Sequence, residues 1–151
     1  MKAFEFELIA LSGISGSGKT TWAMEWVSDD PANRIRVNQD DIRAVLFAVP
    51  TYSKEQEAQV RTRHEEMVVA GLLAKKSVIS DNTNLTAGKL QHLHDIARHH
   101  GAGFRIHRLH ATFDEAKTNI AQRVAGGGRD VSINILRDQY EAFRKSVDVT
   151  F

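Results

Sequence analysis

The chain has 151 residues, a length typical of one compact domain, and 42% of them are hydrophobic. Twenty basic and nineteen acidic residues leave a net charge of +1, so a nucleic-acid site would have to be a local patch. The absence of cysteine excludes a disulfide framework and a thiolate metal site. The apolar runs fall short of the ~20 residues of a membrane span, and no signal-peptide pattern is present, so we expect a cytoplasmic protein without a membrane partner.

Apolar periodicity switches repeatedly between strand and helix spacing along the chain. Ser53 and Gln56 have the spacing of a capping box, Pro50 is expected to close the preceding helix, and Gly101 to end a later one. Strands that alternate with helices favour right-handed crossovers and a parallel sheet covered on both faces. In chain order we predict strand 6–13, helix 19–29, strand 34–38, helix 40–49, helix 53–76, strand 77–84, helix 86–101, strand 103–111, helix 112–124 and helix 132–147.

The segment GISGSGKT at residues 13–20 fits the phosphate-loop spacing G-x-x-x-x-G-K-[ST]. Its glycines let successive N–H groups turn inward around an anion, and the following helix adds its positive end. Lys19 is expected to reach the β- and γ-phosphates of ATP, and Thr20 to ligate Mg²⁺. A chance Gly/Ser turn is the alternative, but the strand before and the helix after favour the phosphate loop. The predicted nucleotide-binding residues are Gly13, Ser15, Gly16, Ser17, Gly18, Lys19, Thr20 and Thr21.

This loop makes the expected fold a P-loop NTPase of the α/β class. We predict a parallel sheet of four to five strands with helices on both faces, in a single kinase domain over residues 1–151. A phosphate loop alone serves kinases, switches and motors, so the reaction has to be inferred from other residues.

Two acidic residues, Asp40 and Asp41, follow the second predicted strand. Ligands of open parallel sheets bind at the carboxyl ends of strands, so this pair should lie near the phosphate loop if the two strands are close. A carboxylate there could accept the proton of an attacking hydroxyl, and Arg43, one helical turn later, could hold a phosphate of the acceptor. The alternative is that one of the two aspartates only caps the helix.

Asp81 follows the apolar part of the run SVISDNTN at residues 77–84. An apolar strand that ends in aspartate resembles a Walker B element, whose carboxylate orients the waters of Mg²⁺. Thr20 and Asp81 are therefore the predicted metal-site residues. Asn82, Thr83 and Asn84 suit a turn equally well, although we assign Asn84 to the acceptor site together with Asp40 and Arg43.

The segment 121–131 combines three glycines with Arg123 and Arg129. A mobile segment with arginines suits a kinase lid that closes over the nucleotide and neutralises charge in the transition state. A flexible surface loop with solvated arginines is the alternative. Residues 61–64, RTRH, on the long helix could likewise meet an acceptor backbone or form an ordinary solvated face. The histidines between 92 and 100 are more typical of a solvated helix than of a metal site.

The segments GSGKTTW, VNQDDIR, VISDNTNL and VSINILRDQY, in this order and at these separations, resemble the phage-type polynucleotide 5′-kinases. The resemblance spans residues 8 to about 145, and N-x-D-D-x-R and D-x-T-N-L are its more specific motifs. It implies Asp40 as general base on the 5′-hydroxyl and Arg43 on the acceptor's 3′-phosphate. It also implies lid arginines on the donor phosphates, where Arg123 matches better and Arg129 shares or takes the role, so the predicted catalytic residues are Lys19, Asp40, Arg123 and Arg129.

The expected function is ATP-dependent phosphorylation of the 5′-hydroxyl end of DNA or RNA in nucleic acid repair. A homo-oligomer and a repair ligase are the protein partners considered, and kinase activity without 3′-phosphatase activity is expected. A small-molecule kinase on the same scaffold is one alternative, which the near-neutral charge favours slightly. A nucleotide-binding regulator without catalysis is the other, and the pairing of Asp40 with Arg43 argues against it.

Overall fold

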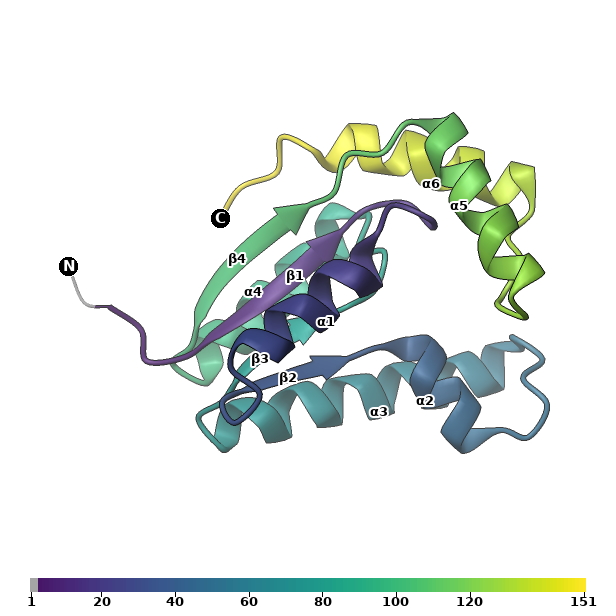
Figure 1. Cartoon of the computed structure of the whole chain (residues 1–151). Helices are drawn as coiled ribbons and strands as arrows, with labels where there is room; N and C mark the ends of the chain where they lie inside the picture. The colour runs from purple at the N-terminus through teal and green to yellow at the C-terminus, as the bar shows by residue number, and fades with distance from the viewer. Residues whose placement is uncertain (1–2) are drawn as a thin grey trace.

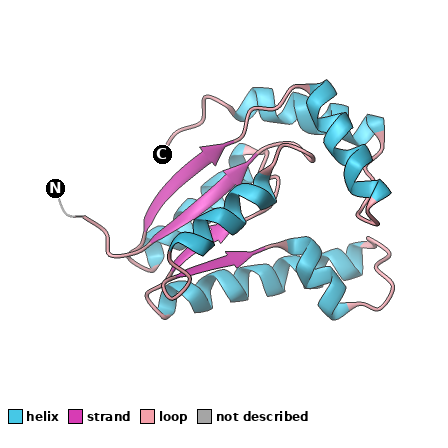
Figure 2. Cartoon of the chain, in the orientation of Figure 1, coloured by secondary structure: helices cyan, strands magenta, loops and turns pink. Residues whose placement is uncertain are grey.

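The computed structural model describes residues 3–151, and its sheet has four parallel strands in the order β2-β3-β1-β4 (Figure 2). The expected α/β fold of the P-loop kinases is confirmed. The strands are β1 (Glu7–Ser12), β2 (Arg34–Val37), β3 (Ser77–Ser80) and β4 (Gly103–Arg108). The helices are α1 (Lys19–Asp29), α2 (Gln39–Leu46), α3 (Lys54–Leu73), α4 (Ala87–His99), α5 (Phe113–Ala125) and α6 (Ile133–Ser146).

The central strand β1 is apolar on both faces, as expected for a buried parallel strand. Leu8 and Ala10 pack in one core cluster with residues of α3 and α4, whereas Ile9 and Leu11 pack in another with Ala23 and Trp26 of α1. Figure 1 shows the same arrangement, with α1 on one side of the sheet and α3 and α4 on the other. Helices therefore cover both faces, and only the strand ends are left for ligands.

The last two helices form a separate layer beyond the carboxyl ends of β1 and β4 (Figure 1). Ile14 of the phosphate loop packs there with Ala116 and Ile120 of α5 and with Leu136 and Phe143 of α6. This packing fixes α5 and α6 against the loop that follows β1.

Several helix boundaries differ from the sequence prediction. The second helix ends at Leu46 rather than at residue 49, because Phe47 adopts an extended conformation (φ −131°) and packs against the main core. The long helix begins after Ser53, whose hydroxyl accepts the Gln56 N–H as expected. It ends at Leu73 rather than at residue 76, and Lys75 has a φ of +59°. Among residues 3–151, no helix is both long and apolar enough to cross a bilayer.

Candidate active site

The phosphate loop leaves β1 at Ser12 and turns sharply twice before α1 begins. Gly16 has a φ of +78° and Gly18 a φ of +92°, angles that side-chain-bearing residues rarely adopt. A Cβ on Gly16 would also come within 2.5 Å of the Ala116 carbonyl oxygen. The Lys19 ammonium donates to the Ile14 carbonyl at 2.8 Å and thus folds back over the loop. The loop therefore has the backbone of an anion cradle with a cation beside it.

Two amide side chains from the α5–α6 layer hold this loop. Asn119 of α5 donates to the Gly16 carbonyl at 2.8 Å, and Gln139 of α6 accepts the Ser15 N–H at 2.8 Å. Sequence reasoning missed both residues. The Gln139 contact joins positions 124 residues apart, so no local spacing could reveal it.

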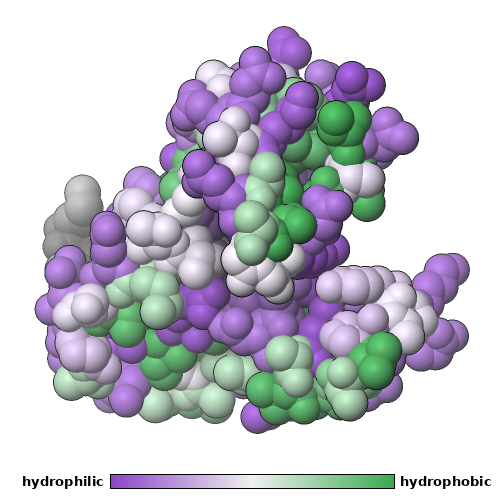
Figure 3. Space-filling model, turned by 45° about the vertical axis from the view of Figure 1, so that its right-hand side comes forward, coloured by the Kyte–Doolittle hydropathy of each residue, from purple (hydrophilic) through white to green (hydrophobic). Residues whose placement is uncertain are grey.

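A pocket of about 1000 Å³ opens in front of the loop, at the carboxyl ends of the strands. Figure 3 shows a hollow on this face, with mostly hydrophilic residues around it. Its donor half contains most of the predicted nucleotide-binding residues, namely Ser15, Gly16, Gly18, Lys19, Thr20 and Thr21. Its other half contains the predicted acceptor residues Asp40 and Arg43, and Asp81, Asn84, Arg123 and Arg129 line the pocket as well. Gly13 and Ser17 are not part of the lining.

Asp81 follows β3 and lies between the two halves. Its Oδ2 accepts the Thr20 hydroxyl at 3.0 Å and Arg36 Nε at 2.7 Å, and the residue is almost fully buried. Its other oxygen, Oδ1, is buried without a hydrogen-bond partner among the described residues. An unpartnered carboxylate oxygen beside a threonine hydroxyl suits Mg²⁺, which proteins hold with one or two carboxylates while the substrate phosphates supply further ligands. Thr20 and Asp81 thus fit the predicted metal site.

The two aspartates of α2 lie in different surroundings. Asp40 lines the pocket, where its Oδ1 accepts from both Arg43 and Arg129. Asp41 points away, with its side chain 64% exposed and paired to Arg36. The helix is capped by neither of them, because Asn38 accepts the Asp41 N–H. Asp40 is therefore the aspartate available for an acceptor hydroxyl.

Arg43 is buried, with only 8% of its surface exposed. It donates through Nε and Nη2 to the two carboxylate oxygens of Glu57, each at 2.7 Å, and this pairing lowers the pKa of Glu57. A bidentate pair of this kind fixes the guanidinium plane. Sequence reasoning missed Glu57. The available signal was an acidic residue in the first turn of the helix that follows the motif residue Arg43, because such a residue can pair with that arginine.

The polar residues after β3 mostly bind other protein groups. Asn84 is buried with a φ of +43°, and its amide donates to the Leu11 carbonyl at 2.7 Å, so it ties the ends of β1 and β3 together. Asn82 accepts the Gln39 N–H and lies 2.9 Å from His64 Nε2. Burial lowers the pKa of His64 to about 4, so the ring is neutral near pH 7. Asp81, and not Asn82, is the residue that contacts Thr20.

Both predicted lid arginines line the pocket, Arg123 from the last turn of α5 and Arg129 from the glycine-rich segment that follows this helix. Arg123 donates to the Arg129 carbonyl at 3.0 Å, and Arg129 reaches across to Asp40 at 3.1 Å. The Arg129 guanidinium also lies 4.5 Å from the centre of the Tyr52 ring. A link therefore already exists between the predicted lid and the acceptor half.

We predict that triphosphate affinity falls as the pH rises through about 8. Burial lowers the pKa of Lys19 from 10.5 to about 8, with Asp81 acting in the opposite direction, so the ammonium loses its proton above that pH in the free protein. Calorimetric titration with a non-hydrolysable ATP analogue from pH 7 to pH 9.5 would measure this. A Lys19→Met variant should bind more weakly and lose the dependence. Equal pH dependence in both proteins would contradict the prediction.

The phosphate loop on a four-stranded parallel sheet flanked by helices defines the class of P-loop kinases. A family model described as "AAA domain" matches residues 8–148, and the chain belongs to this family. The resemblance found in the sequence motifs agrees with this result in that both indicate a P-loop kinase domain.

Solved structures with this fold include two of a repair assembly. The structure of the Pnkp1/Rnl/Hen1 RNA repair complex matches with a TM-score of 0.86 and 24% identity over 98% of this chain and 47% of that chain. A second Pnkp1/Rnl/Hen1 structure matches with a TM-score of 0.69 and 27% identity over 78% of this chain and 40% of that one. This chain thus spans less than half the length of either relative.

A small-molecule kinase has the same fold. The APS kinase CysC of Mycobacterium tuberculosis, solved in complex with AMPPNP and APS, matches with a TM-score of 0.60 and 19% identity. The match covers 82% of this chain and 73% of that chain. The fold therefore accommodates acceptors of different kinds, and the acceptor has to be inferred from the site itself.

Proposed function

We propose that this protein transfers the γ-phosphoryl group of ATP to the 5′-hydroxyl of a DNA or RNA strand, in nucleic acid end repair. The observation that supports this most directly is Asp40 next to Arg43 in the half of the pocket opposite the phosphate loop. A carboxylate base and a rigidly held guanidinium side by side suit an acceptor with a hydroxyl and a phosphate close together. The 5′ end of a polynucleotide has both.

In this proposal Asp40 takes the proton of the 5′-hydroxyl while the hydroxyl oxygen forms a bond to the γ-phosphorus. The bond between that phosphorus and the β–γ bridging oxygen breaks, and ADP leaves. Lys19 and the loop amides hold the donor phosphates, and Arg123 and Arg129 neutralise charge on the transferred group. Thr20 and Asp81 would hold Mg²⁺, which would offset the negative charge of the triphosphate.

The test is transfer of γ-³²P from ATP-Mg²⁺ to short 5′-hydroxyl oligonucleotides, with DNA and RNA in parallel. Label at the 5′ end, absent from a 5′-phosphorylated control strand, is the expected result. No label on either strand, with ATP binding intact, would contradict the proposal.

A metabolite kinase is the second candidate, favoured by the near-neutral net charge of +1. Salt dependence separates the two, because an acceptor held through several phosphates binds more weakly as salt rises, and a neutral acceptor does not. A screen of sugars, nucleosides and adenylyl sulfates follows if oligonucleotides fail. The Pnkp1/Rnl/Hen1 match also makes a ligase the first partner to test by co-purification.

We predict that Glu57→Gln raises the acceptor KM about ten- to a hundredfold, since a hydrogen bond to a charged group is worth about 1.5–3 kcal/mol. Glu57 acts through Arg43, so kcat at saturating acceptor should change far less than KM, and ATP affinity should not change. Steady-state kinetics with oligonucleotide as the varied substrate would measure the split. Glu55→Gln, an exposed carboxylate in the same helical turn, is the control. A loss confined to kcat would overturn this role.

A further inference from the structure

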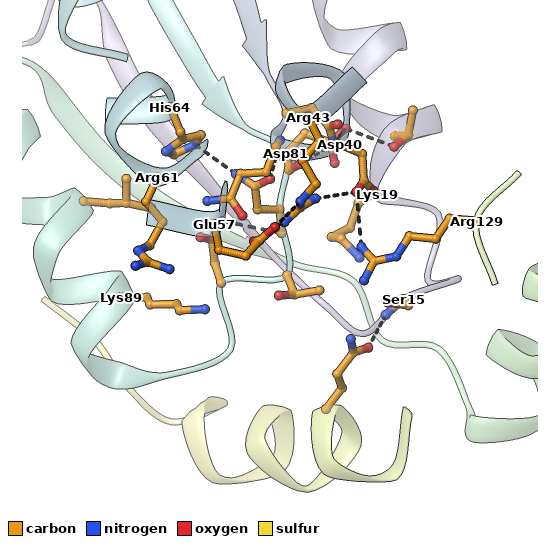
Figure 4. Close-up of a pocket in the computed structure, with 18 of the residues that line it drawn as sticks. Ser15, Lys19, Asp40, Arg43, Glu57, Arg61, His64, Asp81, Lys89 and Arg129 are labelled. Carbon is orange, nitrogen blue, oxygen red and sulfur yellow. Dashed lines mark hydrogen bonds and ion pairs between the residues drawn. The ribbon is translucent and has the colours of Figure 1, made fainter. Parts of the chain in front are cut away.

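The acceptor half of the pocket extends beyond Arg43 along α3. Arg61 lies one helical turn after Glu57, and residues four apart on a helix share a face, about 5–6 Å between Cβ atoms. Both residues line the pocket. Lys89, in the first turn of α4, lines the same pocket, and Figure 4 draws the Arg61 and Lys89 side chains on the same side of it.

These two cations differ from the others of the pocket. Arg43 is held by Glu57, Arg129 contacts Asp40, and Lys19 donates to a loop carbonyl. Within residues 3–151, the side chains of Arg61 and Lys89 form neither an ion pair nor a hydrogen bond. The carboxylates of this region are bonded elsewhere, because Glu57 binds Arg43 and Glu65 hydrogen-bonds to His92.

Two unpartnered cations on facing helices create a local positive patch in a protein with a net charge of only +1. Ile96 of α4, which is only partly buried, also lines the pocket, so some apolar surface lies beside the charge. An anion flanked by flat apolar groups suits such a place, and a phosphodiester between two nucleosides has this character.

We propose that Arg61 and Lys89 form a second phosphate-binding position, which takes the phosphodiester one nucleotide further along the acceptor strand than the phosphate at Arg43. This inference rests on the proposed function and specifies its substrate as a strand with at least two internucleotide phosphates. The strand then runs from Asp40 past Arg43 and out between α3 and α4.

The test compares a 5′-hydroxyl dinucleotide, which has one phosphodiester, with a trinucleotide, which has two. The wild type should show a lower KM for the trinucleotide. In an Arg61→Ala/Lys89→Ala variant this advantage should disappear, while the dinucleotide KM and both kcat values stay unchanged. The slope of log KM against log salt for the trinucleotide should fall by about 0.7, the contribution of one phosphate contact on a single strand.

Arg63→Ala/Lys145→Ala is the matched control, because it removes two exposed cations that do not line this pocket. It should leave the trinucleotide advantage intact. Equal KM values for wild type and the Arg61/Lys89 variant on the trinucleotide would overturn this inference but not the proposed function. An equal rise in KM for the dinucleotide and the trinucleotide would do the same. If the wild type labels no oligonucleotide, the result contradicts the proposed function and also the second phosphate position, which depends on it.

Discussion

An Asp40→Asn variant should bind ATP like the wild type and transfer its phosphoryl group about 10²- to 10⁴-fold more slowly, the usual contribution of a positioned general base. Asparagine keeps the shape of the side chain but cannot accept the proton. Asp40 lies outside the phosphate loop, so the donor half should be unaffected. Single-turnover transfer to a 5′-hydroxyl oligonucleotide, with calorimetry for ATP affinity, separates the two effects.

Asp41→Asn is the matched control for this experiment. It changes the neighbouring residue of the same helix in the same way, but its side chain is exposed and faces Arg36 instead of the pocket. Its transfer rate should equal that of the wild type. A wild-type transfer rate in the Asp40 variant, or an equal loss of rate in both variants, would contradict the role of Asp40 as the general base.

Asp81→Asn should raise the Mg²⁺ concentration for half-maximal activity about 10- to 100-fold, as expected when a residue that orients the metal shell is lost. The substitution removes the charge of a buried carboxylate whose Oδ1 is otherwise unpartnered and whose Oδ2 accepts from Thr20. Activity measured against Mg²⁺ at saturating ATP gives the shift. ATP binding in the absence of metal should remain.

The same substitution weakens the ion pair between Asp81 and Arg36, so its effect on the stability of the fold has to be measured separately. Asp41→Asn again supplies the control, because it removes the other carboxylate partner of Arg36. Thermal melting of both variants should show destabilisation, but only the Asp81 variant should need more Mg²⁺. A Mg²⁺ requirement that shifts equally in both would contradict a metal role for Asp81.

The element order was predictable because it depends on local periodicity and capping. All ten helices and strands follow the sequence prediction within a few residues, and α1 matches it fully. The phosphate loop was predictable as well, since its function lies in consecutive backbone groups. Spacing alone left the choice between Asp40 and Asp41 open, because it depends on which side of α2 faces the pocket, and only the family resemblance pointed to Asp40.

The contacts that complete the site could not be predicted, because they join distant segments. Gln139 reaches the phosphate loop from α6, and Arg129 reaches Asp40 across 89 positions. The sheet order was also not foreseen. β2 pairs with β3 and not with β1, so Asp40 comes to the phosphate loop's pocket across an intervening strand.

That intervening strand lies between β1, which leads into the phosphate loop, and β2, which leads to the proposed acceptor base Asp40. Asp81, at its end, contacts Thr20 on one side and, through its carbonyl oxygen, the Asn38 amide at the start of α2 on the other. Under the proposed function, substitutions in α2 and α3 would therefore alter the choice of substrate while nucleotide binding is preserved. Such a division would let new specificities evolve from an existing kinase by changes in two adjacent helices, provided that this one aspartate is kept.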